Sequence, residues 1–216
     1  MKTHNRKDYE LAAGFLLLFL AWTLAIRTID VQAIGPRGSS VGFAALNGFF
    51  HTLTGVHMRL YTITDWLGLA PVFIAFGFAV LGLIQLIRRK SLFRVDVDIL
   101  VLDGFYILVI GCYLFFEFFV INYRPVLIGG YLEASYPSST TLMVLCIVPT
   151  AILQFRKRVK NTNIKKAVNT LLSVFLLFMT VGRLISGVHW FTDIIGGVLL
   201  SGSLVMLYVA VNKSFA

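Results

Sequence analysis

A cation, an imidazole and a carboxylate stand close together between two long apolar runs near the end of the chain. They are Arg183, His189 and Asp193. His189 and Asp193 are four residues apart, so they share one face if the last apolar run is helical. A carboxylate that accepts from one imidazole nitrogen fixes the tautomer and leaves the other nitrogen free to attack. The planar guanidinium of Arg183 suits phosphate oxygens, whereas the alternative interpretation is a polar cluster that only caps two helix ends.

The composition defines the environment in which these residues must work. The chain has 216 residues, of which 58% are hydrophobic and 13% are charged, whereas a soluble domain is about half apolar and about a quarter charged. We therefore predict an integral membrane protein that forms a single domain over residues 1–216. The net charge of +9 does not indicate a nucleic-acid partner, because the basic residues form short clusters beside the apolar runs. That pattern is a topology signal.

Six apolar runs approach the ~20 residues that a helix needs to cross hydrocarbon. They predict an all-α, six-span bundle with spans at 11–26, 66–87, 99–121, 137–155, 167–185 and 189–211. The basic start could also belong to a signal peptide, but Arg27 and Asp30 interrupt the potential cleavage region and favour an uncleaved first span. Residues 41–61 are half apolar and predict an amphipathic segment in the membrane interface.

The lysines all fall on one side of this six-span arrangement. They lie before the first span, after the second, after the fourth and after the sixth. The other side carries only arginines, which are Arg27, Arg37, Arg59, Arg124 and Arg183. The positive-inside rule therefore predicts that both termini lie in the cytoplasm. It also predicts a plasma-membrane protein whose polar groups at the outer ends of spans three to six face the extracytoplasmic side.

Four separate pieces of chain bring polar groups to those outer ends. A proline followed by serines and threonines opens the fourth span, and a helix N-terminus offers amide donors and a favourable dipole to an anion. Together with two arginines this predicts a phosphate cradle, and a nearby imidazole makes it a phosphoryl-transfer site. No metal-ligand set accompanies the imidazole, so we expect no metal or cofactor. The candidate residues are Glu117, Arg124, Ser138, Ser139, Thr140, Arg183, His189 and Asp193.

These residues resemble three signatures of the type 2 phosphatidic acid phosphatase superfamily, integral-membrane lipid phosphatases related to the vanadium haloperoxidases. The family has Lys, six residues, Arg-Pro; then Pro-Ser-Gly-His; then Ser-Arg, five residues, His, three residues, Asp. The resemblance covers roughly residues 60–211 and implies a metal-free bundle of six helices. The matching stretches here are Glu117 to Arg124-Pro125, Pro137-Ser138-Ser139-Thr140, and Gly182-Arg183 to His189 and Asp193.

The resemblance also implies a role for each matching position. His189 would form a phosphohistidine, and Asp193 would orient it. Arg124 and Arg183 would hold the phosphoryl oxygens, helped by donors around Ser138 and Ser139.

The chain departs from the family at three positions. Glu117 stands in place of lysine, Thr140 in place of the general-acid histidine and Gly182 in place of serine. Threonine cannot act as a general acid near neutral pH. Either the leaving group departs without a proton, as a lipid monophosphate leaving from a diphosphate can, or His51 or His57 supplies the proton if the loop after the first span folds over the site. Glu117 is about 10 Å from Arg124 along a helix at ~1.5 Å per residue. It would either orient an arginine or recognise a hydroxyl or an amine on the substrate.

Three functions remain as hypotheses. The first is a phosphatase that hydrolyses a lipid phosphate or diphosphate, of the polyprenyl diphosphate or phosphatidate type, at the outer leaflet. The second is a phosphotransferase on the same scaffold, and the third is a non-catalytic relative that binds or transports a phospholipid. Because His189 and Asp193 are both present, the sequence favours an enzyme over the non-catalytic relative. We place the phosphatase ahead of the transferase, with a lipid phosphate or diphosphate and membrane lipid as its partners.

Overall fold

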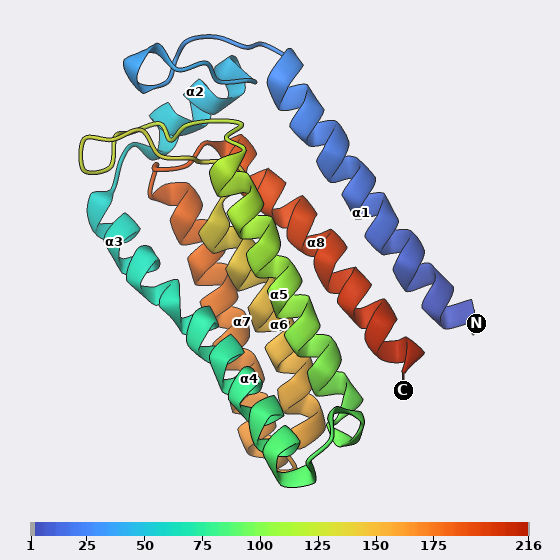
Figure 1. The fold of residues 1–216 in the computed structure, drawn as a ribbon. Coiled ribbons are helices and arrows are strands. Elements are labelled where there is room, and N and C mark those ends of the chain that lie inside the picture. Colours follow the sequence, from blue (N-terminus) through green and yellow to red (C-terminus); the bar gives the residue numbers. More distant parts are fainter. Residues whose placement is uncertain (1–2, 216) are drawn as a thin grey trace.

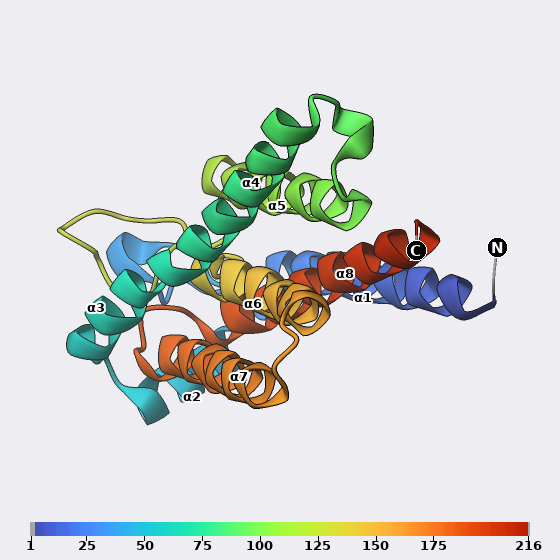
Figure 2. The same ribbon diagram turned by 90° about the horizontal axis from the view of Figure 1, so that it is seen from below.

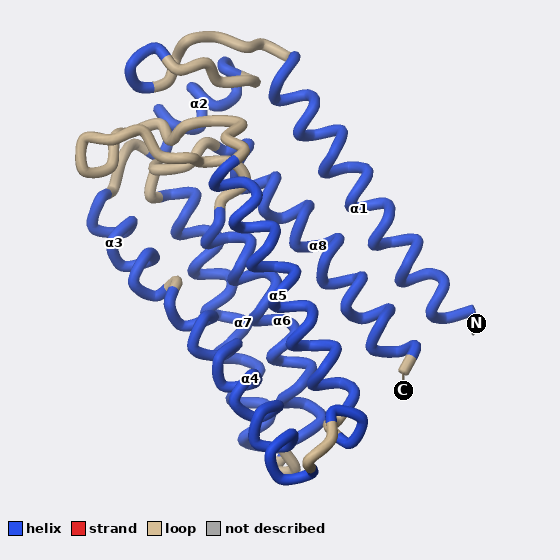
Figure 3. Tube along the Cα trace, in the orientation of Figure 1, coloured by secondary structure: helices blue, strands red, loops and turns tan. Residues whose placement is uncertain are grey.

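The computed structural model describes residues 3–215 of the chain. Within these residues the regular structure is helical, and the loops contain only isolated β-bridges (Figure 3). The all-α prediction is therefore confirmed. The helices are α1 (Thr3–Thr28), α2 (Ala44–Thr54), α3 (Met58–Leu67), α4 (Leu69–Arg89), α5 (Val97–Phe118), α6 (Ser139–Arg158), α7 (Thr162–Ile185) and α8 (Phe191–Ser214), with short 3₁₀ turns at Pro36–Gly38 and Leu92–Arg94.

Six helical segments are long and apolar enough to cross a membrane, as predicted. They are Asn5–Thr28, Met58–Arg89, Val97–Phe118, Ser139–Arg158, Thr162–Ile185 and Phe191–Ser214. The second segment begins well before the predicted start at residue 66, because α3 continues into α4 with only a turn at Gly68 between them. The interfacial segment predicted at residues 41–61 ends inside α3, and the polar residues that follow it, Thr62, Thr64 and Asp65, belong to the same helix. Of these, Thr64 is buried, while Ile63 and Trp66 point outward.

The predicted start of the fifth span, at residue 167, is also too late. Helix α7 begins at Thr162, where the Asn161 side chain accepts hydrogen bonds from the amides of Asn163 (2.9 Å) and Ile164 (3.1 Å). Such a cap stabilises the first turn of a helix whatever its hydropathy. The helix therefore extends past its apolar run, and Lys165 and Lys166 belong to its first turns.

Helices α6 and α8 form the centre of the bundle. In their most apolar stretches 56% and 50% of the residues are buried, against 17% in both α1 and α7. Seen from below, α6 lies between the α4–α5 pair and α7 (Figure 2). Helix α1 packs along α8 (Figure 1), where the ring of Phe15 lies against Gly202.

Both ends of the described chain lie at one end of the bundle, together with the α4–α5 and α6–α7 connections (Figure 1). The described lysines all belong to this end. The opposite end holds the segment with α2, the 119–138 loop and the α7–α8 connection. The architecture thus separates the lysines as the six-span arrangement requires, and the cytoplasmic placement of this end stays a prediction.

Helix α2 covers the end of the bundle that lacks lysines. The buried side chain of Asn47 accepts from the amide of Thr192 (3.2 Å) and donates to its hydroxyl (3.0 Å), at the start of α8. The indole of Trp22 in α1 donates to the carbonyl of Thr192 (3.2 Å). The loop after the first span therefore folds back over this end of the bundle, and its place in the membrane interface stays a prediction.

The topology can be tested by labelling with an impermeant thiol reagent in intact cells. A cysteine at Tyr131, which is 74% exposed in the 119–138 loop, should react if that end is extracytoplasmic. A cysteine at the exposed Asn161 should react only after the cells are permeabilised. The native Cys146 is fully buried and serves as the unreactive control. Labelling at Asn161 alone in intact cells would invert the topology.

Candidate active site

His189 lies on the α7–α8 connection, outside the sixth span in which the sequence placed it. Asp193 is in the first turn of α8 and accepts a hydrogen bond from the amide of Trp190 (2.9 Å). The predicted shared helical face is therefore wrong, although the two side chains still meet in a buried position. Their closest atoms, Nδ1 of His189 and Oδ2 of Asp193, are 3.7 Å apart, which is too far for a direct hydrogen bond.

Ser135 fills the position between these two side chains. Its hydroxyl donates to Oδ2 of Asp193 and lies 3.2 Å from Nδ1 of His189. The amide of Asn122 reaches the other carboxylate oxygen, Oδ1, at 3.4 Å. Neither Ser135 nor Asn122 was among the candidates from the sequence. The available signal was their position beside two family signatures, Ser135 just before Pro137 and Asn122 just before Arg124.

The 119–138 loop is fixed to the start of α8 by its backbone. Tyr123 and Ala134 form an antiparallel bridge, and the amide of Ser135 donates to the carbonyl of Asn122 (2.9 Å). The indole of Trp190 donates to the carbonyl of Tyr123 (2.8 Å). These contacts hold both strands of the loop against the segment that carries His189 and Asp193.

Arg183 is the largest fully buried side chain of the protein and is only 1% exposed. Its Nη1 faces the Thr64 hydroxyl at 3.4 Å and a carboxylate oxygen of Asp65 at 3.5 Å, both on α3. Its Nη2 lies 3.4 Å from Nε2 of His189. The guanidinium therefore stands between the acidic side chain on α3 and the free nitrogen of the imidazole.

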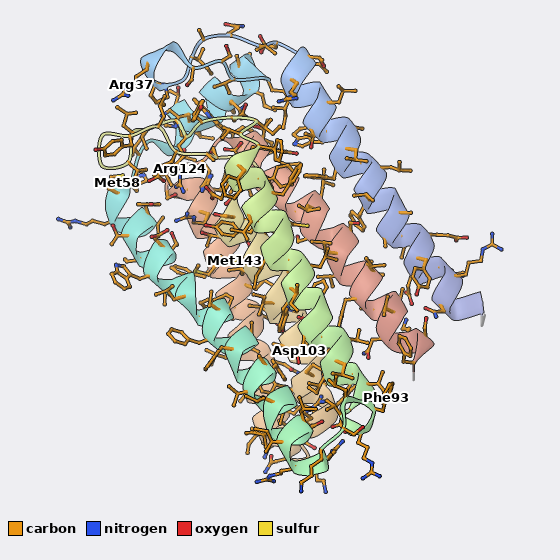
Figure 4. All side chains as sticks on the ribbon, viewed as in Figure 1. Arg37, Met58, Phe93, Asp103, Arg124 and Met143 are labelled. Carbon is orange, nitrogen blue, oxygen red and sulfur yellow. The ribbon has the colours of Figure 1, made fainter. Side chains whose placement is uncertain are left out.

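Arg124 lies at the loop-covered end of the bundle (Figure 4) and is also buried. Its Nε forms an ion pair with Glu133 at 3.1 Å. Both guanidiniums lie over the ring of Tyr61, with their central carbons 5.6 Å (Arg124) and 4.9 Å (Arg183) from the ring centroid, a distance at which cation–π attraction operates. Nη1 of Arg124 and Nε of Arg183 donate no hydrogen bond within residues 3–215, so both cations retain donors for an anion.

Glu117 does not pair with Arg124, because Glu133 takes that position. Glu117 instead lines a narrow pocket together with Ser135 and Ser139. The sequence left two roles open for Glu117, to orient an arginine or to recognise a group on the substrate. Other residues fill the first role, since Glu133 pairs with Arg124 and Asp65 pairs with Arg183.

The N-terminus of α6 lies next to Asp193 at the edge of the site. The amide of Ser138 donates to the backbone carbonyl of Asp193 (3.1 Å), and its hydroxyl accepts from Thr141 (3.0 Å). Because no side chain caps the helix, the amides of its first turn remain available as donors. Thr140 is buried on the side of Gly68, where an added Cβ would lie 3.4 Å from its methyl group.

The structure gives a steric reason for a glycine at position 182, which the sequence did not reveal. A Cβ at this position would lie 3.0 Å from the methyl group of Thr64. The missing side chain lets α3 approach α7 closely enough for Thr64 and Asp65 to reach Arg183. A second close approach joins Gly187, at φ +68°, to Gly55, whose carbonyl oxygen would lie 1.8 Å from an added Cβ.

The segment with His51 and His57 folds over this end of the bundle, which is the condition under which the sequence allowed either histidine to supply a proton. The ring of His51 lies 5.5 Å from that of Trp190, and burial lowers its pKa. His57 bonds through its amide to the carbonyl of Ser186 (2.9 Å) and through Nε2 to the carbonyl of Thr54 (2.8 Å). The His51 ring and the His57 backbone therefore contact the α7–α8 connection, whereas the His57 imidazole bonds within its own segment.

Electrostatics favours a neutral His189. Burial lowers the pKa of its imidazole well below the usual range, and the nearby positive charges of Arg124 and Arg183 lower it further, while a bond to the backbone of Ser135 acts in the opposite direction. A neutral imidazole with a donor at Nδ1 keeps a lone pair on Nε2. That lone pair faces the Nη2 side of Arg183, where a phosphoryl group would lie.

This arrangement of an imidazole, a carboxylate and two arginines at the end of the bundle without lysines agrees with the similarity to known proteins. A family model of the PAP2 superfamily matches residues 105–215, which is just over half of the chain. The chain belongs to the PAP2 superfamily. The resemblance stated from the signatures is thereby confirmed.

A solved PAP2 structure shares the fold. The crystal structure of a transmembrane PAP2-type phosphatidylglycerolphosphate phosphatase from Bacillus subtilis matches with a TM-score of 0.68 and 17% identity, over 95% of this chain and 98% of that one. No curated protein matches the chain. Within residues 3–215 no three His, Cys, Asp or Glu side chains gather closely enough to hold a metal ion.

The electrostatic interpretation of this PAP2 site predicts a measurable shift in the pKa of His189. Arg124→Gln removes one positive charge near the imidazole, so the pKa should rise toward its usual range while remaining below it, because the side chain stays buried. A pH titration of ¹⁵N-histidine-labelled protein by NMR measures this. Arg37→Gln is the matched control, because Arg37 bonds to the carbonyl of Gly130 at the far side of the loop. Equal His189 titrations in both variants would contradict the assignment.

Proposed function

We propose that this PAP2 protein is a membrane phosphatase that hydrolyses a lipid phosphate or diphosphate at the outer leaflet. One observation carries the proposal. Nε2 of the buried His189 lies 3.4 Å from Nη2 of Arg183, while its other nitrogen is occupied by Ser135 beside Asp193. A nucleophile and an anion-binding group thus meet at one point, which is the arrangement that phosphoryl transfer to histidine requires.

The reaction follows from these positions. The Nε2 lone pair attacks phosphorus, the P–N bond forms and the P–O bond to the lipid breaks, so the leaving oxygen keeps the electron pair. Arg124 and Arg183 hold the equatorial oxygens, and the amides at the start of α6 add neutral donors. Water then attacks phosphorus and the P–N bond breaks, so its electron pair returns to Nε2 and restores the neutral imidazole. Phosphate leaves, and the proton lost by the water ends on the lipid oxygen. A phosphotransferase would share the first half and differ only in the acceptor.

The location of the ionic groups supports a lipid substrate that enters from the bilayer. Asp65 is half-exposed beside Arg183, and Glu133 is 41% exposed beside Arg124. On the same helix as Asp65, Trp66 is 72% exposed. In the proposed binding mode the head group approaches the arginines past these two carboxylates, while its acyl or prenyl chain lies along the outer face of α3.

The proposal predicts that His189→Ala abolishes turnover of lipid phosphates while the bundle remains folded. Asp193→Asn should reduce turnover strongly, by up to the ~10⁴-fold that loss of an orienting carboxylate costs a catalytic histidine. Phosphate release from a panel of lipid phosphates in detergent measures both, and an acid-labile phosphoprotein should form in wild type only.

Three outcomes separate the hypotheses. Full turnover in purified His189→Ala protein would refute catalysis by this residue. Specific lipid binding by wild type without any turnover would favour the non-catalytic relative. Loss of lipid phosphate without release of inorganic phosphate would favour the transferase.

The absence of the acid histidine predicts a preference among leaving groups. A lipid alcohol leaves as an alkoxide whose conjugate acid has a pKa near that of water, about 15.7, so its departure needs a proton. A lipid monophosphate leaving from a diphosphate is a much weaker base, with a second pKa of about 6. Because Thr140 cannot supply a proton, we expect a polyprenyl diphosphate to turn over faster than the matching monophosphate.

The same substrates test whether position 140 causes this preference. Thr140→His should raise the monophosphate rate more than the diphosphate rate, by up to the ~10²-fold that a general acid supplies at the lower end of its range. Thr140→Asn is the control for the added volume. If wild type prefers the monophosphate, and alanine at His51 and His57 leaves that preference unchanged, the leaving-group argument is wrong.

A further inference from the structure

Three hydrogen-bonding groups in the site form a chain instead of a pair. The imidazole of His189 and the carboxylate of Asp193 are 3.7 Å apart at their closest atoms. The Ser135 hydroxyl donates to Oδ2 of Asp193 and lies 3.2 Å from Nδ1 of His189. All three residues are buried, with exposures of 4%, 0% and 2% in the order named. Solvent therefore does not compete for any of these contacts.

The backbone leaves the Ser135 hydroxyl little freedom. Its amide donates to the carbonyl of Asn122 (2.9 Å), and the loop that carries it is bridged at Tyr123 and Ala134. On the other side Asp193 is fixed by the amide of Trp190 (2.9 Å). Both ends of the Ser135–Asp193 bond are thus set by main-chain contacts, as a residue that orients a reacting group requires.

The direction of the bonds follows from the donor inventory. An ionised carboxylate can only accept, and a hydroxyl has one hydrogen and two lone pairs. Because the Ser135 hydrogen points to Asp193, only its lone pairs remain for His189. Nδ1 must then carry the proton and donate to the serine oxygen, which leaves the lone pair on Nε2, the nitrogen beside Arg183.

We propose that Ser135 is the positioning residue of the site, transmitting the orienting effect of Asp193 to His189 through its hydroxyl. The inference rests on the proposed function of His189 as a nucleophile. In the attack the P–N bond forms at Nε2 and the P–O bond breaks, while the Nδ1 proton and the Ser135 proton both stay where they are. The imidazole becomes positively charged when phosphorylated, and the oriented hydroxyl dipole stabilises that charge with Asp193 behind it.

The test is Ser135→Ala, with turnover and KM measured on a lipid phosphate that wild type hydrolyses. We expect kcat to fall by about 10- to 100-fold, less than the ~10⁴-fold effect of a mis-set tautomer, because Asp193 and its negative charge remain in place behind the imidazole. KM should change by less than about twofold, since the arginines that bind the phosphate are untouched. Ser201→Ala is the matched control, because this buried hydroxyl bonds only to the backbone carbonyl of Val198.

A double variant distinguishes transmission from a separate structural effect. If Ser135 acts through Asp193, Ser135→Ala combined with Asp193→Asn should be no slower than Asp193→Asn alone. Multiplied losses in the double variant, or equal kcat values for Ser135→Ala and Ser201→Ala, would overturn the proposal.

A second measurement does not depend on turnover. In ¹⁵N-histidine-labelled protein, wild-type His189 should be the neutral tautomer with its proton on Nδ1, and Ser135→Ala should increase the fraction with its proton on Nε2. Ser201→Ala should leave the tautomer unchanged. If wild type hydrolyses no lipid phosphate but the tautomer shifts, the proposed function fails and the positioning role stands. An unchanged tautomer in Ser135→Ala refutes the positioning role even in an active enzyme.

Discussion

The burial of the Arg183 guanidinium is the constraint on which the loop-covered end of this bundle depends. Removing such an ion from water costs several kcal/mol even after relaxation, so the charge requires partners at short range. Here α3 supplies a hydroxyl, a carboxylate and the Tyr61 ring, and the α7–α8 connection supplies His189. Helix α3 must consequently stay against α7. The division of the second span into α3 and α4 is a consequence of this contact as well as of hydropathy.

The same buried charge explains which parts of the molecule the sequence could predict. Spans are read from hydropathy, and lysines mark the water-exposed ends, so the six-span arrangement and the PAP2 signatures were accessible. The boundaries failed where polar side chains face protein instead of water. The second span was predicted to begin only after Thr64 and Asp65, although both belong to α3 and face Arg183. His189 was assigned to a helix because its spacing from Asp193 fits one, but the chain forms a tight connection before α8 begins.

The partners within the site were not accessible from the sequence. Glu133 and Ser135 lie in a loop without periodicity, and their contacts with Arg124 and Asp193 depend on how two loop strands pair. A single sequence contains no signal for such pairing, because register in a short irregular loop is set by tertiary contacts. The distance along a helix made Glu117 appear to be the partner of Arg124, whereas the loop returns Glu133 to that position.

The close approach at Gly182 links two positions that lie far apart in the chain. The signature serine of other PAP2 proteins would bring its Cβ to 3.0 Å from the Thr64 methyl group, a contact tighter than most that real side chains make. A serine at position 182 would therefore press on Thr64, and its cost depends on whether residue 64 or α3 can give way by a few tenths of an ångström. The two positions should consequently be judged as a pair: in this chain a serine at 182 is expected to fit better beside a side chain smaller than that of Thr64.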